Sequence, residues 1–312
     1  LSNDPETKSI FYKDSGFQIG DNFIQEDLAQ TLSRISSYGY REFYSGKTAD
    51  LIIECMDRTD GLISYLDLAN YKPIERKPIE FYYRDSKVIT MPPASSGGIV
   101  LAEILNQLEN LDMNKIPYHS AEHIHYMAEV EKRAYADRAE ILGDSDFIDI
   151  PIDLLASDDY AKNKMSDIDC CNATPSVDIK PFQVLNSEKD ETTHYSIVDK
   201  WGNAVSVTTT VNGWYGSGIT VDNAGFLLNN EMDDFSIKPG YPNKYGLVGS
   251  WANSIAPNKR MLSSMSPTIV EDEDGDLFLV LGSPGGSTII TTVAQIISNI
   301  IDYNMPIKDA IE

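Results

Sequence analysis

The sequence predicts an α+β fold in which helices come first, strands follow, and a helix closes the readable part. Residues 1 to about 160 show mostly helical apolar spacing, whereas the residues that follow a polar stretch ending at Glu191 are rich in β-forming side chains. Helical spacing returns from Ser287 onward. Segregated helices and strands of this kind pack as layers around a shared core.

The first part of the chain contains three predicted helices. Apolar residues recur with helical spacing at Leu28, Leu32 and Ile35. Gly39 is a suitable stop for this helix, because glycine favours the position after a helix end. A second helix is expected at Thr48–Met56. Ser64 followed by Asp67 resembles a capping box that opens a third, short helix.

A hairpin and two longer helices are predicted next. The β-rich runs Phe81–Tyr83 and Val88–Thr90 flank a turn at Asp85 and Ser86. Pro92–Gly98 is rich in proline, serine and glycine, which indicates a loop. Helical spacing then predicts helices at Ile99–Leu108 and at about Ser120–Leu142.

The segment Asn186–Glu191 is entirely polar and predicts an exposed linker. After it come two hairpins, a single strand and a helix of about 15 residues from Ser287. The predicted strands are His194–Asp199 paired with Ala204–Val211, Phe226–Leu228 alone, and Pro267–Val270 paired with Leu277–Leu281.

Composition excludes several classes of protein. The 312 residues contain 48 Asp and Glu against 25 Lys and Arg, a net charge of -23, so nucleic acid is not an expected partner. The most apolar stretch, Thr288–Ile301, is too short and too polar to span a membrane. Three cysteines in no framework spacing predict neither disulfides nor a zinc site. The start at Leu1 without a signal peptide suggests a chain whose beginning is missing.

Two segments resemble metal sites. His119 and His123 fit the H-x-x-E-H zinc pattern, but no third ligand is marked, and an ordinary polar helix face is the simpler interpretation. Asp272–Asp276 is as acidic as a calcium loop, yet it lacks the 12-residue spacing and the closing glutamate of an EF-hand. We therefore expect an acidic hairpin turn there, and no metal or cofactor.

Gly282–Ser287 precedes a helix and could bind an anion through backbone N–H groups. No lysine follows its glycines, so it is not a P-loop. The same N–H groups would serve equally well as donors to an oxyanion.

Thr192 is the strongest nucleophile candidate. A threonine hydroxyl needs a neighbouring base, and an N-terminal threonine carries one in its own α-amine, which titrates near pH 8. Breaking the Glu191–Thr192 bond would create that amine, and a polar linker running into a strand is a place where such a cut is possible. From spacing alone, a strand that simply starts with two threonines is the favoured interpretation of the segment.

The chain resembles the gamma-glutamyltranspeptidase family in several segments that occur in the family's order. They are Met91–Pro93 with Ser95–Gly98, Tyr135–Arg138, Thr192–Lys200 with Gly202–Val205, Leu227–Phe235, Pro257–Arg260, Leu262–Thr268 and Gly282–Ser287. The resemblance implies an N-terminal-nucleophile hydrolase fold, a four-layer αββα sandwich. It also implies autocatalytic cleavage between Glu191 and Thr192.

The family's chemistry maps onto named residues. Thr192 would be the nucleophile, Thr210 would orient it, and Gly285 and Gly286 would donate to the oxyanion. Six residues would bind the substrate: Asn212, Glu231 and Asp234 at its α-ammonium group, Ser263 and Ser264 at its α-carboxylate, and Tyr245 in the lid loop Lys238–Gly246. An arginine that also binds this carboxylate in the family is expected to precede the chain, and none of the arginines here matches it.

The resemblance divides the chain into two parts. Residues 1–191 would be the back of a large subunit, and residues 192–312 the front of a small catalytic subunit that continues beyond Glu312. Expected partners are glutathione or other gamma-glutamyl compounds, with water, amino acids or dipeptides as acceptors. The expected location is periplasmic or extracellular.

Two alternatives stay open at this point. One is a related N-terminal-nucleophile amidase of the cephalosporin acylase or poly-gamma-glutamate type. The other is an unprocessed, inactive homologue that serves as a binding protein.

Overall fold

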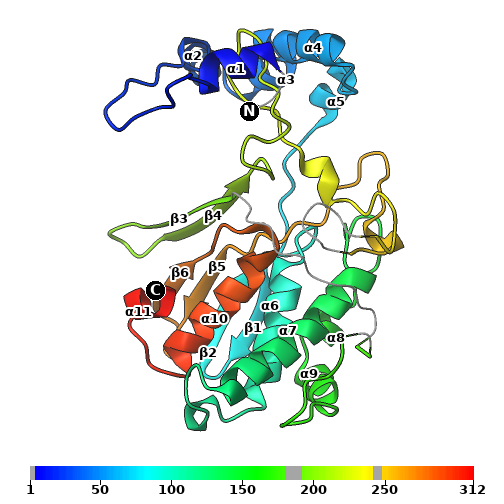
Figure 1. Ribbon diagram of the computed structural model, residues 1–312, viewed down its shortest axis with the longest axis vertical. Helices are drawn as coiled ribbons and strands as arrows, with labels where there is room; N and C mark the ends of the chain where they lie inside the picture. The colour runs from blue at the N-terminus through cyan, green and yellow to red at the C-terminus, as the bar shows by residue number, and fades with distance from the viewer. Residues whose placement is uncertain (1–3, 177, 180–191, 242–247) are drawn as a thin grey trace. The chain divides into compact units, whose positions relative to one another are not determined.

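The computed structural model describes residues 4–176, 178–179, 192–241 and 248–312 (Figure 1). The chain divides into two compact units, each made of two stretches that are separate in sequence. The first unit joins Leu1–Glu75 to Val211–Asn230, and the second joins Arg76–Thr210 to Glu231–Glu312. Within the described ranges, no helix combines the length and apolar character needed to cross a membrane.

The second unit is built on a four-stranded antiparallel sheet in the order β1-β2-β5-β6. Its strands are β1 (Ile79–Tyr83), β2 (Ser86–Thr90), β5 (Thr268–Glu271) and β6 (Leu277–Leu281). Along β1, buried and exposed side chains alternate, as expected for a strand with one face on a core. Both predicted hairpins are therefore confirmed.

The first of these hairpins turns one residue earlier than predicted. Tyr83 and Ser86 still pair, so Arg84 and Asp85 form the turn. Arg84 adopts a φ of +53°, the left-handed backbone that two-residue hairpin turns require. Ser86 belongs to the strand because its backbone completes the ladder.

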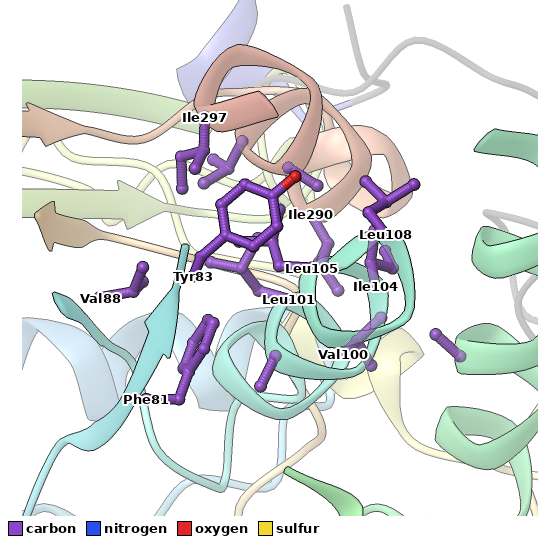
Figure 2. Close-up of a cluster of buried hydrophobic side chains, with 14 of the residues drawn as sticks. Phe81, Tyr83, Val88, Val100, Leu101, Ile104, Leu105, Leu108, Ile290 and Ile297 are labelled. Carbon is purple, nitrogen blue, oxygen red and sulfur yellow. The ribbon is translucent and has the colours of Figure 1, made fainter. Parts of the chain in front are cut away.

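Two apolar helices cover the sheet in the second unit. α6 (Gly97–Glu109) and α10 (Ile289–Ile301) pack against each other, and α6 also packs on β1. Figure 2 shows Tyr83 among Leu101, Leu105 and Ile290 in this core. Residues 97–108 of α6 are all buried, because the helix contacts the sheet and other helices on several sides.

Of the other four α-helices described in the second unit, the first three pack against α6 and the last packs against α10. They are α7 (Ala121–Ile141), α8 (Ile152–Leu155), α9 (Asp158–Met165) and α11 (Ile307–Ile311). The predicted helices in α6, α7 and α10 are confirmed, whereas α8, α9 and α11 were not predicted. Each of these three spans too few turns to produce a clear apolar period.

A separate two-stranded sheet lies against the ends of β5 and β6. It consists of β3 (Thr192–Val198) and β4 (Ala204–Thr210) and confirms the predicted hairpin. Ser206 connects the two sheets: its hydroxyl donates to the Leu281 carbonyl at 2.9 Å and accepts from the Thr268 N–H at 3.0 Å. Helices and two packed sheets give the predicted α+β class.

The predicted subunit boundary does not coincide with a boundary between the compact units. β2, from residues 1–191, pairs with β5, from residues 192–312, in a ladder that includes Thr90 and Thr268. A cut at residue 191 would therefore leave the two pieces joined through one sheet. The predicted division at this bond stays a prediction, and the predicted linker Asn186–Glu191 lies outside the described residues.

The first unit is helical. Its helices are α1 (Pro5–Phe11), α2 (Glu26–Tyr38), α3 (Tyr40–Ser45), α4 (Lys47–Thr59) and α5 (Tyr65–Asn70). The predicted stop at Gly39 is confirmed by its φ of +71°, and both hydrogen bonds of the predicted capping box between Ser64 and Asp67 are present. α1 and α3 were not predicted.

The predicted strand Phe226–Leu228 is wrong. Leu227 forms only an isolated bridge with Thr220, and no ladder extends from it among the described residues. Phe226 and Leu228 instead pack against the apolar cluster built by α4. Their apolar character therefore reflects burial under a tight loop and not membership of a sheet.

Candidate active site

Thr192 and Thr210 face each other at the end of the β3–β4 ladder. They are register partners in the antiparallel pair, and the Thr192 side chain is buried. Directly opposite residues in such a pair have Cβ atoms about 4.5–5.5 Å apart, so their hydroxyls lie within reach of each other. This geometry agrees with a nucleophile and a hydroxyl that orients it.

His194 connects the strand that starts at Thr192 to the glycine-rich loop after β6. Side chains two apart in a strand share a face, so His194 lies on the face of β3 that carries Thr192. The His194 ring lies so close to Gly282 that a Cβ on this glycine would sit 2.3 Å from it. The glycine-rich loop Gly282–Ser287 thus begins beside β3.

The loop then presents two backbone N–H groups at the start of a helix. Gly285 has a φ of +126° and Gly286 a φ of +51°, and the short helix η4 (Gly286–Thr288) leads into α10. The Gly285 carbonyl accepts from both the backbone N–H and the hydroxyl of Thr288, each at 2.9 Å. Among the described residues, the N–H groups of Gly285 and Gly286 donate to no protein acceptor. They can donate to an oxyanion.

Ser263 and Ser264 lie in a loop held to the start of α6. The Ser96 N–H and hydroxyl both donate to the Ser263 carbonyl, at 2.9 and 2.7 Å. The Ser263 hydroxyl accepts from the Met265 N–H at 3.1 Å, and the Ser264 hydroxyl accepts from Arg138 at 3.1 Å. Within the described ranges neither serine hydroxyl donates to a protein acceptor. Both can donate to a carboxylate.

Glu231 and Asp234 form the two ends of the short helix η2 (Glu231–Asp234). Burial raises the pKa of Glu231 above its usual value. Asn253 joins this acidic turn to the serine loop, since its side chain donates to the Asp234 carbonyl at 2.7 Å and accepts from the Leu262 N–H at 3.0 Å. The acidic pair and the serine pair are thus held by one buried asparagine.

The segments that resemble metal sites have other structures. A helix face carrying both histidines was expected, but His119 lies before the start of α7. Its ring stacks on the ring of Tyr118, with the two ring centroids 3.9 Å apart. The segment Asp272–Asp276 is the expected hairpin turn, closed by Asp272, whose carboxylate accepts from the Asp274 and Asp276 N–H groups.

Another cluster has ligand atoms close enough to share a metal ion. It consists of the exposed residues Asp169, Cys170 and Cys171, whose ligand atoms lie within 4.8 Å of one another. None of these three residues belongs to the predicted site.

Glu131 on α7 gives a prediction for the pH dependence of stability. Burial raises its pKa to about 7, and Gln295 on α10 donates to its carboxylate at 3.3 Å. The unfolded carboxyl ionises near pH 4.5. As the pH rises from that value to about 7, the unfolded chain loses this proton while the folded chain keeps it, so folding stability falls.

Glu131→Gln should remove this fall. We expect the variant to gain about 1–3 kcal/mol relative to the parent between pH 4.5 and pH 8. Urea unfolding of both chains at the two pH values measures the gain. An unchanged stability difference across this range would show that Glu131 is not held neutral.

Comparison with known proteins places the chain in a family. The family model described as Gamma-glutamyltranspeptidase matches residues 1–312. The chain belongs to the gamma-glutamyltranspeptidase family. The resemblance carried by the motifs is thereby confirmed.

Individual relatives agree with the family match. The Glutathione hydrolase proenzyme of Escherichia coli (strain K12) is 51% identical over 311 residues, which are 99% of this chain and 53% of the relative. The Acylase ACY 1 proenzyme of Pseudomonas sp. (strain V22) is 35% identical over 295 residues, 95% of this chain and 50% of the relative. The chain thus spans about half the length of these curated relatives.

A solved structure supports the fold. The crystal structure of cephalosporin acylase from Bacillus halodurans superposes with a TM-score of 0.80 over 98% of this chain and 53% of that chain. Its 24% identity shows a shared fold alone. Together with the family match, it confirms the predicted N-terminal-nucleophile fold class.

The structure places most of the predicted site residues in the second unit. Asn212 belongs to the first unit, where its side chain donates to the Asn230 carbonyl at 3.1 Å, so its role stays a prediction. Glu191 and Tyr245 lie outside the described residues.

Three residues that hydrogen-bond to the loops of the site were given no role in the sequence analysis. Tyr135 and Arg138 stand in a segment that resembles the family, but the pattern gave no function for either. Asn253 had no signal at all, because an asparagine in a serine-rich loop is typical of any turn.

Proposed function

We propose that the protein transfers or hydrolyses gamma-glutamyl groups through an acyl-enzyme on Thr192, after autocatalytic cleavage of the Glu191–Thr192 bond. The pairing of Thr192 with Thr210 at the start of β3 is the observation that carries this proposal. A threonine freed at this position would hold its own base beside its hydroxyl.

The reaction would proceed in two stages. The α-amine of Thr192 takes the hydroxyl proton while the hydroxyl oxygen attacks the γ-carbonyl carbon of the donor. Gly285 and Gly286 donate to the resulting oxyanion. The C–N bond then breaks, the proton passes to the departing amine, and an ester on Thr192 remains. Water or an acceptor amine attacks this ester, and the Thr192 oxygen leaves and regains a proton.

The charges around the site support a donor that is an α-amino acid at one end. Acidic side chains at Glu231 and Asp234 suit an ammonium group, and the free hydroxyls of Ser263 and Ser264 suit a carboxylate. Glutathione and other gamma-glutamyl compounds carry both groups at that end. Among the relatives, the curated glutathione hydrolases are named for such a substrate, which supports the same reading.

The second candidate is an amidase for another acyl group. The likeness to an acylase proenzyme at 35% identity favours it. A donor without an α-ammonium group offers no cation to the acidic side chains of Glu231 and Asp234, so we rank it second.

Comparing two anilide donors tests the choice. We expect the full-length protein to cleave a gamma-glutamyl anilide at least about 100-fold more efficiently than the glutaryl anilide, which lacks the α-ammonium group. Asp234→Asn should remove most of this preference by raising the KM of the gamma-glutamyl donor about 30–100-fold, since it removes one partner of a charged hydrogen bond.

Asp233→Asn is the matched control, because it removes the same charge from the same turn. We expect a much smaller change in KM from it. Equal cleavage of both anilides by the parent protein would instead favour the amidase, and cleavage of neither, with an uncut chain, would favour the inactive binding homologue.

A further inference from the structure

Helix α7 makes hydrogen bonds to two loops of the site. One loop carries Gly285 and Gly286, and the other carries Ser263 and Ser264. Tyr135 donates its hydroxyl proton to the Ser287 carbonyl, in the loop of Gly285 and Gly286. Arg138, one turn further along, donates from Nη2 to the Ser264 hydroxyl at 3.1 Å and from Nε to the Ser96 hydroxyl at 2.9 Å. One face of α7 therefore contacts both loops.

Arg138 is a buried cation that makes no ion pair with any carboxylate in the described part of the chain. Its relative exposure is 5%, and its guanidinium donates to two neutral hydroxyls, those of Ser96 and Ser264. Burial lowers the pKa of its guanidinium, and electrostatic interactions with Tyr135 and Asp234 act in the opposite direction. An arginine stays protonated even so, and a buried charge that forms no ion pair is costly. The position is therefore suited to an anion brought by a ligand.

The hydrogen-bond directions show where that anion would sit. Because the Ser264 oxygen accepts from Arg138, its own hydroxyl proton must point elsewhere. The Ser263 oxygen accepts from the Met265 N–H in the same way. Arg138 also fixes Ser96, which in turn donates to the Ser263 carbonyl. The arginine thus acts on both serines of the pair.

We propose that Arg138 is the positioning residue for substrate carboxylates at Ser263 and Ser264: it orients the Ser264 hydroxyl outward and supplies the positive charge that the carboxylate neutralises. This inference rests on the proposed function, because that function makes the carboxylate the α-carboxylate of a gamma-glutamyl donor. It gives a role to Arg138, which had received none from the sequence.

Two ligand pairs that differ only in the α-carboxylate test the proposal in the full-length protein. The first pair, gamma-glutamyl and 4-aminobutyryl 4-nitroanilide, reports turnover. The second pair, L-glutamate and 4-aminobutyrate, reports binding by calorimetry without any reaction. Arg138→Met should weaken binding of L-glutamate and raise the KM of the glutamyl anilide by about 30–100-fold, with less than about 3-fold change for the ligands without the carboxylate.

Arg138→Lys keeps the charge but loses the fork that reaches two hydroxyls, so we expect partial rescue, with an effect of about 10-fold. If Arg138→Met does not fold, the same measurements on Arg138→Lys still test the proposal. Tyr135→Phe is the matched control on the same helix. It removes the bond to the glycine-rich loop, so kcat should fall for both anilides while the ratio between them stays constant.

The outcomes separate the two proposals. A parent protein that binds L-glutamate over 4-aminobutyrate, and loses this preference in the Arg138 variants, supports the arginine even if neither anilide is cleaved. Cleavage of the glutamyl anilide with the carboxylate preference unchanged in folded Arg138→Lys and Arg138→Met overturns the role of Arg138 and leaves the proposed function intact. No preference for L-glutamate in the parent overturns the carboxylate site itself.

Discussion

Thr192→Ala is expected to yield a single uncut chain whose turnover of a gamma-glutamyl anilide is lowered by about 10⁴-fold or more. The substitution removes the hydroxyl that the proposal uses both to cut the chain and to attack the donor. It also removes the partner of Thr210 at the end of the β3–β4 ladder. Gel electrophoresis and anilide release measure the two effects on the same preparation.

Two further variants make this result specific. Thr192→Ser keeps a hydroxyl on the same atom position, so it should still cut, more slowly, and retain part of the activity. Thr193→Ala changes the exposed neighbour and should cut and turn over normally. Two subunits of normal size from Thr192→Ala, or loss of cutting in Thr193→Ala alone, would remove Thr192 from the role of nucleophile.

Gly285→Ala is expected to lower kcat by about 10²–10³-fold, the usual effect of losing one oxyanion donor. Gly285 has a φ of +126°, which residues with a side chain rarely adopt, and a Cβ there would lie 2.6 Å from the Thr288 hydroxyl. Relief of this clash must turn the peptide groups of the loop, so the N–H groups lose their direction. Steady-state kinetics should show the loss in kcat with KM changed much less.

Gly275→Ala is the control for backbone strain alone. Gly275 also has a positive φ, +82°, but a Cβ there meets nothing within 4 Å, and the residue lies in the turn between β5 and β6. We expect a stability loss of about 1 kcal/mol with normal kcat. If Gly275→Ala lowered kcat as much as Gly285→Ala, the loss in Gly285→Ala would be due to general destabilisation and not to the lost oxyanion donor.

The sequence predicted the elements with a strong repeating pattern. The helical apolar spacing of α10 produces a clear period, β1 and β2 are rich in β-forming side chains on either side of a turn, and the structure confirms all three elements. Phe226–Leu228 shows the limit of this reasoning, because a short apolar run looks alike whether it joins a ladder or packs under a loop. α3, with 6 residues, is too short for any period to be recognised.

Local chemistry indicated only two parts of the candidate site, and the family resemblance supplied the roles of the other residues. A threonine at a linker-to-strand junction and paired glycines before a helix are local signals. Arg138 and Ser264 are 126 residues apart, and nothing in either segment indicates that they meet. The two hydrogen bonds of the Asn253 side chain could not be predicted for the same reason, since its partners Asp234 and Leu262 lie in different loops.

Intact mass and N-terminal sequencing of the full-length protein test the central claim most directly. The account predicts two chains, the second beginning Thr192-Thr193-His194, with a free amine beside the hydroxyl it activates. An active preparation whose chain is unbroken at this bond, or whose new terminus is any residue other than Thr192, would contradict it.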